Sequence, residues 1–266
     1  MMKKIASILI IILLACGVIF LFVFANQKQN EVLCSEFIIN IDYGNAPQLI
    51  TKSTIRQQIT EAGIRIKGQP VEGIPVKKLH QLLAKNPYIK KATISINVNG
   101  VVKANILQRD PLIRVMDQDF NQCIIDREGH RMPVNPFFPV RLKVANGNIR
   151  SLKKSKIDTV MNESGRGYTL VKALPPDLEK IHKIASKLEE DTLTSALIEQ
   201  IYFNDMREIE LVPKVGDQLI ILGDTTSLNE KLRNLRIFYS EGMRNLAWNN
   251  YKVINLKYKN QVVCSK

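Results

Sequence analysis

One apolar run near the start of the chain, from Ile5 to Ala25, constrains its organisation more than any other feature. The run contains no charged residue and no proline, and Ser7 is its only clearly polar side chain. A helix of roughly 20 apolar residues is needed to cross the ~30 Å hydrocarbon core of a bilayer. We therefore predict a transmembrane helix over 5–25, preceded by a cytoplasmic tail of residues 1–4 and followed by a linker over 26–35.

The flanks of this run predict its orientation. Lys3 and Lys4 precede it, whereas the segment from Asn26 to Glu31 carries little net charge. Positively charged flanks of transmembrane helices stay in the cytoplasm. The pattern thus predicts a single-pass protein of the cell inner membrane, with its N-terminus in the cytoplasm and its C-terminal domains in the periplasm.

Two other interpretations of the run compete with the anchor. Val23-Phe24-Ala25 has the small residues of a signal-peptidase site, and Leu13-Leu14-Ala15-Cys16 suggests lipidation of Cys16. However, the apolar core of a signal peptide usually spans ~7–15 residues, and this run is longer. A polar tether normally follows a lipidated cysteine, but residues 17–25 stay apolar. An uncleaved anchor is the interpretation that fits best.

The composition of the remaining chain limits the classes of function. About 240 residues follow the run, which allows one large domain or two small ones. The net charge of +13 is spread along the chain without a dense basic run, so we expect no nucleic-acid partner. The cysteines Cys16, Cys34, Cys123 and Cys264 are too far apart in sequence for a Cys-x-x-Cys metal or redox site, and the sequence leaves their disulfide pairing open.

Residues 36–111 are predicted to form one compact unit. A β-branched strand over 37–41 precedes a helix that Thr51 or Ser53 would cap, with Ile55, Ile59 and Ala62 on its buried stripe. A second helix begins after Pro75, buries Leu79 and Leu83, and ends at Asn86-Pro87. Strands over 94–98 and 101–108 are joined by Asn99-Gly100, a strong hairpin signal. The expected order is strand, helix, helix, strand, strand.

Residues 112–266 are predicted to form a second domain. Its strands are expected over 112–116, 120–125, 141–145, 197–203, 208–213 and 218–222, and one terminal strand is expected over 253–263. One amphipathic helix begins at Pro175 or Pro176, and a second carries Leu228, Leu232, Leu235 and Phe238 on its inner face. Residues 147–167 are weakly patterned and predict a mobile loop. The fold class is α+β, with a mostly antiparallel β domain and flanking helices.

The sequence offers no persuasive catalytic or cofactor site. Asp126, Glu128 and His130 alternate and could hold a metal ion, but a tight polar turn already accounts for these residue types. Gly165-Arg166-Gly167 lacks the strand and the Gly-Lys-Ser/Thr of a phosphate loop. Asp224 to Ser227 are interpreted as the cap of the following helix. We expect no enzyme activity, no cofactor, no metal and no small-molecule substrate.

Several segments together resemble the bacterial cell-division family FtsQ, also called DivIB. The first is Asn86 to Pro111, "NPYIKKATISINVNGVVKANILQRDP", which is similar to the second half of the family's POTRA domain. Its closing Gln108-Arg109-Asp110-Pro111 departs from a Glu-Arg-x-Pro-type motif at Gln108, which places any salt bridge of that acid in doubt. The others are "CIIDREGH", "LGD" and a closing "INLKY", which are similar in order to the family's β domain.

This resemblance implies a function and a binding site. It implies a divisome scaffold at the septum that holds FtsB- and FtsL-type partners and, through them, the septal peptidoglycan synthase of FtsW/FtsI type. The terminal strand would be an open edge to which a partner adds a strand. The predicted partner-binding residues are Asn255, Leu256, Lys257, Tyr258, Lys259, Asn260, Gln261, Val262 and Val263.

Two alternatives remain from the sequence. A membrane-anchored peptidoglycan-binding or hydrolytic envelope protein would have a cleft with paired carboxylates and aromatic platforms. An outer-membrane assembly factor would normally carry several POTRA repeats or a barrel, whereas one such unit is visible here.

Overall fold

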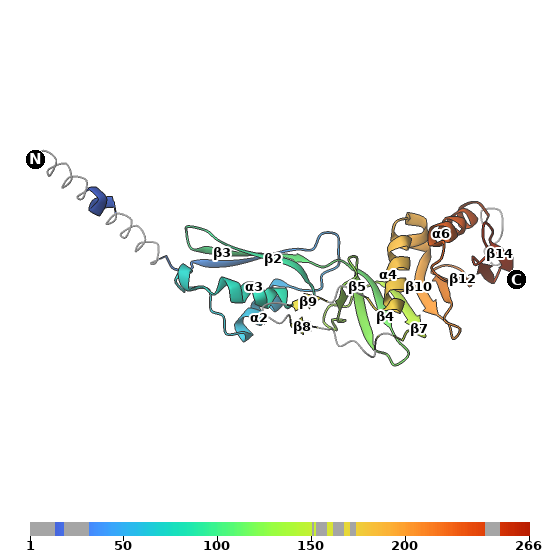
Figure 1. The fold of residues 1–266 in the computed structure, drawn as a ribbon, viewed down its shortest axis with the longest axis horizontal. Coiled ribbons are helices and arrows are strands. Elements are labelled where there is room, and N and C mark those ends of the chain that lie inside the picture. The colour runs from blue at the N-terminus through green and yellow to red at the C-terminus, as the bar shows by residue number, and fades with distance from the viewer. Residues whose placement is uncertain are drawn as a thin grey trace, which may run out of the picture. The chain divides into compact units, whose positions relative to one another are not determined.

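The structure, a computed structural model, describes residues 14–18, 32–150, 152, 159–161, 168–170, 174–242 and 251–266. The described chain divides into two compact units (Figure 1). The first comprises the residues up to Asp42 together with Thr51–Leu107, and the second comprises Tyr43–Ile50 together with Gln108–Lys266. The short segment Tyr43–Ile50 thus belongs with the second unit although it lies within the first in sequence.

The predicted anchor lies mostly outside the described residues. Residues 14–18 are helical, and their side chains are exposed. No helix within the described ranges is long and apolar enough to span a bilayer. The transmembrane helix over 5–25 and its orientation therefore stay predictions.

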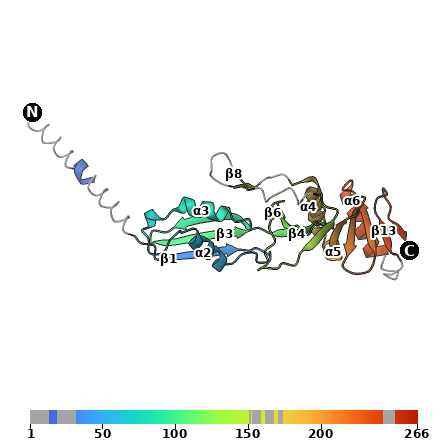
Figure 2. The same cartoon turned by 90° about the horizontal axis from the view of Figure 1, so that it is seen from below.

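The first unit has the predicted order of elements, with one additional short 3-10 helix. Its three strands form a sheet in the order β1-β3-β2, and β1 runs parallel to β3. Figure 1 shows α2 and α3 together on one side of this sheet, and Figure 2 shows the same helices in front of it. The elements are β1 (Glu36–Asp42), α2 (Lys52–Glu61), η1 (Val71–Gly73), α3 (Val76–Ala84), β2 (Ile89–Ile96) and β3 (Val101–Gln108).

Local sequence explains why these helices begin where they do. Thr51 caps α2, because its Oγ1 accepts a hydrogen bond from Thr54 N at 3.2 Å while Thr54 Oγ1 accepts one from Thr51 N at 3.0 Å. The two helices bury the predicted residues Ile55, Ile59, Leu79 and Leu83. Ala62 was expected on the same stripe, but it is exposed because α2 ends at Glu61.

The hairpin between β2 and β3 turns where Asn-Gly predicted it. Strand β2 begins at Ile89, five residues earlier than expected, and the turn places Gly100 at φ +76°. A Cβ on Gly100 would lie 2.3 Å from the Leu33 carbonyl oxygen, so this position requires glycine. The close approach fastens the chain that enters β1 to the tip of the hairpin.

The second unit is built on a nine-stranded mixed sheet in the order β14-β13-β12-β11-β10-β7-β4-β5-β6. Strand β7 is parallel to β4 and β10, and β13 is parallel to β12, whereas the other neighbours are antiparallel. The α+β class and the predominantly antiparallel β domain are therefore confirmed. The strands are β4 (Pro111–Met116), β5 (Gln122–Asp126), β6 (Arg131–Met132), β7 (Lys143–Gly147), β10 (Ile198–Phe203), β11 (Ile209–Pro213), β12 (Leu219–Gly223), β13 (Val253–Asn255) and β14 (Val263–Ser265).

Helices α4 (Pro176–Glu189), α5 (Thr192–Leu197) and α6 (Leu228–Ile237) pack with this sheet around one hydrophobic core. The π-helix η2 (Phe238–Gly242) continues α6. Helix α5 was not predicted; Asp191 caps it through a hydrogen bond from Thr194 N to Oδ1 at 2.9 Å. Six residues with a single cap are too short to leave a periodic pattern in the sequence.

The segment predicted as a mobile loop over 147–167 lies largely outside the described residues. Its described part includes β8 (Thr159–Met161), which pairs antiparallel with β9 (Tyr168–Leu170). The strand β8 therefore lies within a segment that the sequence predicts to be a loop.

Candidate partner-binding edge

The end of the chain is not the single strand predicted over 253–263. It forms two short strands, β13 and β14, joined by a turn over 256–262. Strand β13 is paired on both sides, with β12 and with β14, so the edge strand at this end of the sheet is β14, and β6 is the edge strand at the other end. The single strand was a wrong prediction because the polar run through Asn260-Gln261 reverses the chain.

Leu256 has a different role from the one predicted for it. Its backbone N–H donates to the Ile221 carbonyl at 2.9 Å, and its side chain is buried in the core with Ile254. A partner cannot contact a leucine in this position without opening the domain. Leu256 therefore holds the terminal segment in place and is not available for binding.

Lys257 is also engaged within the protein. Its Nζ donates to Glu208 Oε1 at 2.8 Å, and this hydrogen bond raises the pKa of Lys257. The side chain crosses Gly223, where an added Cβ would lie 2.8 Å from the lysine carbons at a φ of +77°. Gly223 thus lets Lys257 lie flat across the end of β12.

Asn260 forms the reversal of the turn. Its backbone has φ +58°, in the left-handed region that asparagine tolerates better than most residues. Its N–H donates to Glu230 Oε1 of α6 at 3.1 Å, so it is not directed at a partner. A proline at this position would disrupt the turn and would not test the edge.

Besides the pair of Lys257 with Glu208, a second ion pair lies near the turn, between α6 and the loop that precedes it. Lys231 Nζ donates to Asp224 Oδ1 at 2.8 Å and to the Leu222 carbonyl at 3.0 Å. The hydrogen bond from Lys231 lowers the pKa of Asp224 from 3.8 to about 2. The predicted capping role of Asp224 to Ser227 is wrong in detail: Ser227 makes no side-chain cap, and Asp224 instead accepts from Thr226 N at 3.0 Å.

Hydrogen bonds between β12 and β13 fix which peptide groups of β13 face which neighbour. Leu219 N donates to the Lys252 carbonyl at 2.8 Å, and Leu256 N donates to the Ile221 carbonyl at 2.9 Å. The Lys252 carbonyl and the Leu256 N–H therefore point toward β12, whereas the Lys252 N–H donates to the Ser265 carbonyl of β14 at 2.9 Å. Because peptide groups alternate in direction along a strand, those of the odd-numbered residues 253 and 255 point toward β14.

The same alternation identifies the open hydrogen-bonding groups of β14. Val253 and Asn255 lie opposite Ser265 and Val263. Those two residues of β14 consequently direct their peptide groups at β13. Cys264 lies between them, so its N–H and C=O point to the open edge. This is the backbone position at which an added strand would pair.

Exposed apolar side chains accompany this edge. Tyr258 is 50% exposed and Val263 is 43% exposed. A groove of about 500 Å³ runs between the end of α6 and the terminal turn. Its lining includes Ile237, Phe238 and Val262. Together the edge and the groove could take an extended segment with an apolar anchor residue.

The structure therefore divides the nine predicted residues. Tyr258, Lys259 and Gln261 are exposed in the turn and Val263 is exposed on β14, whereas Leu256 is buried and the others hold the turn or the sheet. Sequence analysis missed Cys264, the residue with outward peptide groups, and Ile237 of the groove. The apolar Val262-Val263-Cys264 run was the signal for β14, but the preceding polar residues were read as part of the same strand.

Two of the motifs that resemble the family, Gln108-Arg109-Asp110-Pro111 and the segment around Asp126, meet in the second unit. Gln108 Oε1 accepts hydrogen bonds from Leu49 N at 2.7 Å and Ile50 N at 3.3 Å, so a neutral amide replaces the expected acid. Arg109, which is buried, donates to Asp126 Oδ2 at 2.9 Å. Gln108 and Arg109 thus join the segment 43–50 and the first β-hairpin of the sheet.

The possible metal ligands Asp126, Glu128 and His130 do lie close together, with ligand atoms within 4.8 Å of one another. Asp126 Oδ1 accepts from Glu128 N at 2.9 Å and from His130 N at 2.7 Å, which is a turn stabilised by its aspartate. Its other oxygen accepts from the Arg109 guanidinium. The protein therefore supplies its own cation to this carboxylate, and turn chemistry explains the cluster.

Two known families match segments that together cover almost the whole described chain. A family described as "FtsQ/DivIB, C-terminal related" matches residues 110–265, which is more than half of the chain. A "POTRA-like domain" matches residues 32–107. No curated protein matches the chain in a sequence search.

Proposed function

Because the chain belongs to the FtsQ/DivIB family, a family of non-catalytic cell-division scaffolds, we propose that it captures FtsB- and FtsL-type partners by strand addition at β14. Through these partners it links the division machinery to a septal synthase of FtsW/FtsI type. The observation that carries this proposal is an open sheet edge at the end of the matched domain.

The chemistry of the edge supports an added strand. The outward N–H and C=O of Cys264 offer backbone hydrogen bonds, the exposed Val263 offers an apolar contact beside them, and Tyr258 is exposed in the turn that precedes β14. Strand addition derives affinity from the main chain and specificity from such side-chain contacts.

The charge at this edge favours an acidic partner segment. Lys252, Lys259 and Lys266 are exposed around β14, and no salt bridge to another described residue involves them. Lys257, which was expected to contribute, is already paired with Glu208. Complementary charges across an interface mainly raise the association rate and reject wrong partners.

The hydrolytic alternative finds little support at the described grooves. A second groove beside the terminal turn, distinct from the one next to Ile237, is lined by Asp224, Glu230 and Tyr258 and so combines two carboxylates with an aromatic side chain. However, Asp224 has a pKa of about 2 and is bound by Lys231, so it could not act as a general acid near neutral pH. Glu230 accepts the Asn260 N–H.

We further propose that residues 5–25 anchor the chain in the inner membrane with the two units in the periplasm. Replacing this segment with another anchor of the same orientation should preserve function, since the proposed contacts lie in the second unit. Mass spectrometry of the mature protein tests the proposal: an N-terminus at Asn26, or a lipid on Cys16, would contradict it.

The binding proposal is tested by deleting Asn260–Lys266 from the tagged full-length chain. We expect septal enrichment and co-purification of small bitopic partners with the intact chain, and loss of those partners with the deletion. Hydrogen exchange of α2 and α3 should be unchanged, because these helices belong to the other unit. Full recovery of the partners by the shortened chain would contradict the proposal, and bound glycan strands with a diffuse envelope signal would favour the alternative.

A further inference from the structure

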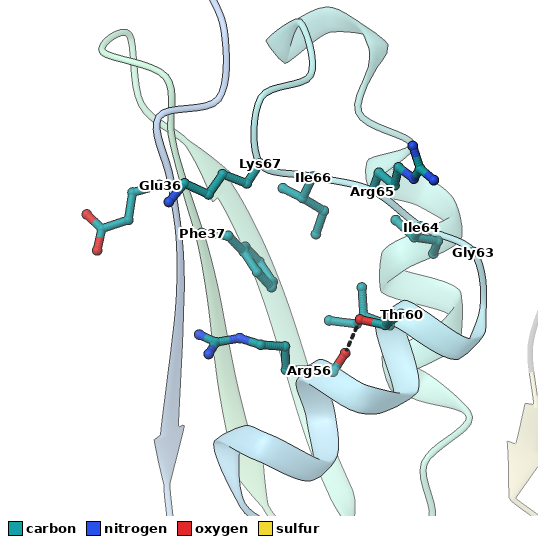
Figure 3. Close-up of a pocket in the computed structure, with 10 residues that line it drawn as sticks. Glu36, Phe37, Arg56, Thr60, Gly63, Ile64, Arg65, Ile66 and Lys67 are labelled. Atoms are coloured by element: carbon teal, nitrogen blue, oxygen red, sulfur yellow. Dashed lines mark hydrogen bonds between the residues drawn. The ribbon is translucent and has the colours of Figure 1, made fainter.

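A pocket in the first unit has no role in the proposed capture of partners. It lies between the start of β1, the C-terminal half of α2 and the loop that follows (Figure 3), and its volume is about 730 Å³. It is lined by Glu36, Phe37, Arg56, Ile59, Thr60, Gly63, Ile64, Arg65, Ile66 and Lys67.

The lining combines an apolar floor with cationic walls. Figure 3 shows Phe37 and Ile66 directed into the space, with Arg56 and Lys67 extending along it on opposite sides of the Phe37 ring. Glu36, the only acidic residue of the lining, points away from it. The pocket therefore presents Arg56 and Lys67 around a half-buried aromatic ring, while Arg65, the third cation of the lining, points away from Phe37 (Figure 3).

These cations are not neutralised by the described protein. Neither Arg56 nor Lys67 forms a salt bridge with any described residue. Several arginines and lysines of the second unit, in contrast, each form one. The sequence over 32–107 carries ten Lys and Arg against four Asp and Glu, which leaves a net charge of 10 − 4 = +6. Such an excess attracts an anionic surface.

Apolar side chains are exposed at the same end of the unit. Phe37 lies opposite Val102 in the parallel register, so it is close to the β2–β3 turn. Val98 at that turn is 83% exposed, and Leu33 beside it is 56% exposed. Ser35 N donates to the Gly100 carbonyl at 3.0 Å, which ties these parts together. We call Leu33, Phe37, Arg56, Lys67 and Val98 the hairpin-side tip.

The position of this tip in the chain brings it near the membrane. Eleven residues lie between the end of the proposed anchor at Ala25 and Phe37, and an extended chain of that length spans at most ~40 Å. We propose that the hairpin-side tip docks on the bilayer that holds the anchor. Arg56 and Lys67 bind the phosphates of anionic phospholipid headgroups, while Leu33 and Val98 enter the interfacial layer. This inference rests on the proposed anchor.

A bilayer explains this combination better than an acidic protein segment does. Isolated exposed apolar residues beside basic ones are the usual composition of a surface that lies in the membrane interface. A short tether also keeps an anionic bilayer at high local concentration, which compensates for weak individual contacts.

The test uses the full-length chain in nanodiscs made of phosphatidylcholine alone or of an equal mixture with phosphatidylglycerol. Amide hydrogen exchange is measured over residues 64–68 and 97–100. We expect slower exchange in the anionic nanodiscs, by up to about 25-fold if each of the two cations contributes about fivefold. Combining Arg56→Gln with Lys67→Gln should abolish this difference.

The matched control combines Lys52→Gln with Lys91→Gln. Both lysines are exposed in the same unit and lie away from the hairpin turn, near the start of α2 and of β2. This control should retain the difference between the lipids. Equal exchange in the two lipids, or equal loss in the control, would overturn the proposal.

Two further outcomes are distinguishable. Protection that requires added polyglutamate and not phosphatidylglycerol would assign the pocket to an acidic protein segment and overturn the lipid proposal. A chain that does not remain in the nanodiscs would contradict the proposed anchor. The same exchange comparison with added vesicles would then show whether the hairpin-side tip binds anionic lipid without the anchor.

Discussion

The direction of the Cys264 peptide groups makes the proposed edge open to a single-residue test. Cys264→Pro removes the outward N–H without removing a hydrogen bond to β13. Val263→Pro is the matched control on the adjacent residue, because its N–H points toward Asn255 and is needed inside the sheet. Cys264→Ala keeps the outward N–H and controls for the loss of the thiol.

The expected loss of partner affinity in Cys264→Pro follows from one lost hydrogen bond. When a partner strand is already buried against the edge, its carbonyl loses a donor, and leaving a buried acceptor unsatisfied costs about 1–3 kcal/mol. That range corresponds to roughly 5- to 150-fold weaker binding. The free energy of unfolding should change little in Cys264→Pro, whereas Val263→Pro should lower it by about 1–3 kcal/mol because Asn255 loses its donor.

The assay compares partner recovery with stability for the three variants. Full-length variants are purified from membranes with their bound partners, and denaturant unfolding is measured on the same preparations. The reasoning requires Cys264→Pro to lose partner while remaining as stable as Cys264→Ala. Equal partner recovery by Cys264→Pro and Cys264→Ala would refute strand addition at this edge.

Three further predictions concern stability. Leu83→Ala should lower the free energy of unfolding of the first unit by about 2–5 kcal/mol, because the side chain is fully buried; an unchanged melting curve would contradict the packing. Arg109→Met should cost about 3–5 kcal/mol by leaving the buried Asp126 carboxylate uncompensated, and adding Asp126→Asn should recover part of this loss in denaturant unfolding. Asp224 has a folded-state pKa of about 2, below its ordinary 3.8, so its ion pair with Lys231 stabilises the domain fully above about pH 4 and is lost as the pH falls through about 2. Because Asp224 is largely exposed, the contribution is below about 1 kcal/mol; a melting temperature of Asp224→Asn that falls with acid as steeply as that of the unaltered protein would contradict this assignment.

Much of the fold was predictable because local chemistry and tertiary packing agree. Thr51 caps α2, and Asn99-Gly100 forms the turn of the hairpin. The apolar stripes of α3 and α6 are buried, as the sequence predicts. Periodicity encodes the buried face of an element, and turn residues encode its ends. The order of these elements, together with the motifs in residues 86–111, "CIIDREGH", "LGD" and "INLKY", indicated the family that the comparisons establish.

Short elements and their neighbours were not predictable in the same way. Helix α5 and the hairpin β8–β9 are too short to produce a periodic signal. Tyr43–Ile50 joins the second unit because Gln108 accepts the Leu49 and Ile50 N–H groups, a contact across about sixty residues of sequence.

The proposed binding edge shows the same division most clearly. The sequence alone determined that the chain ends in strand-forming residues, with Leu256 and Tyr258 in a closing β segment. Only the tertiary structure decided that Asn260 reverses this segment, that Leu256 enters the core and that Cys264 faces the open edge. The physical reason is that a strand's sequence encodes which side chains alternate, whereas the direction of each peptide group depends on which neighbour the strand pairs with.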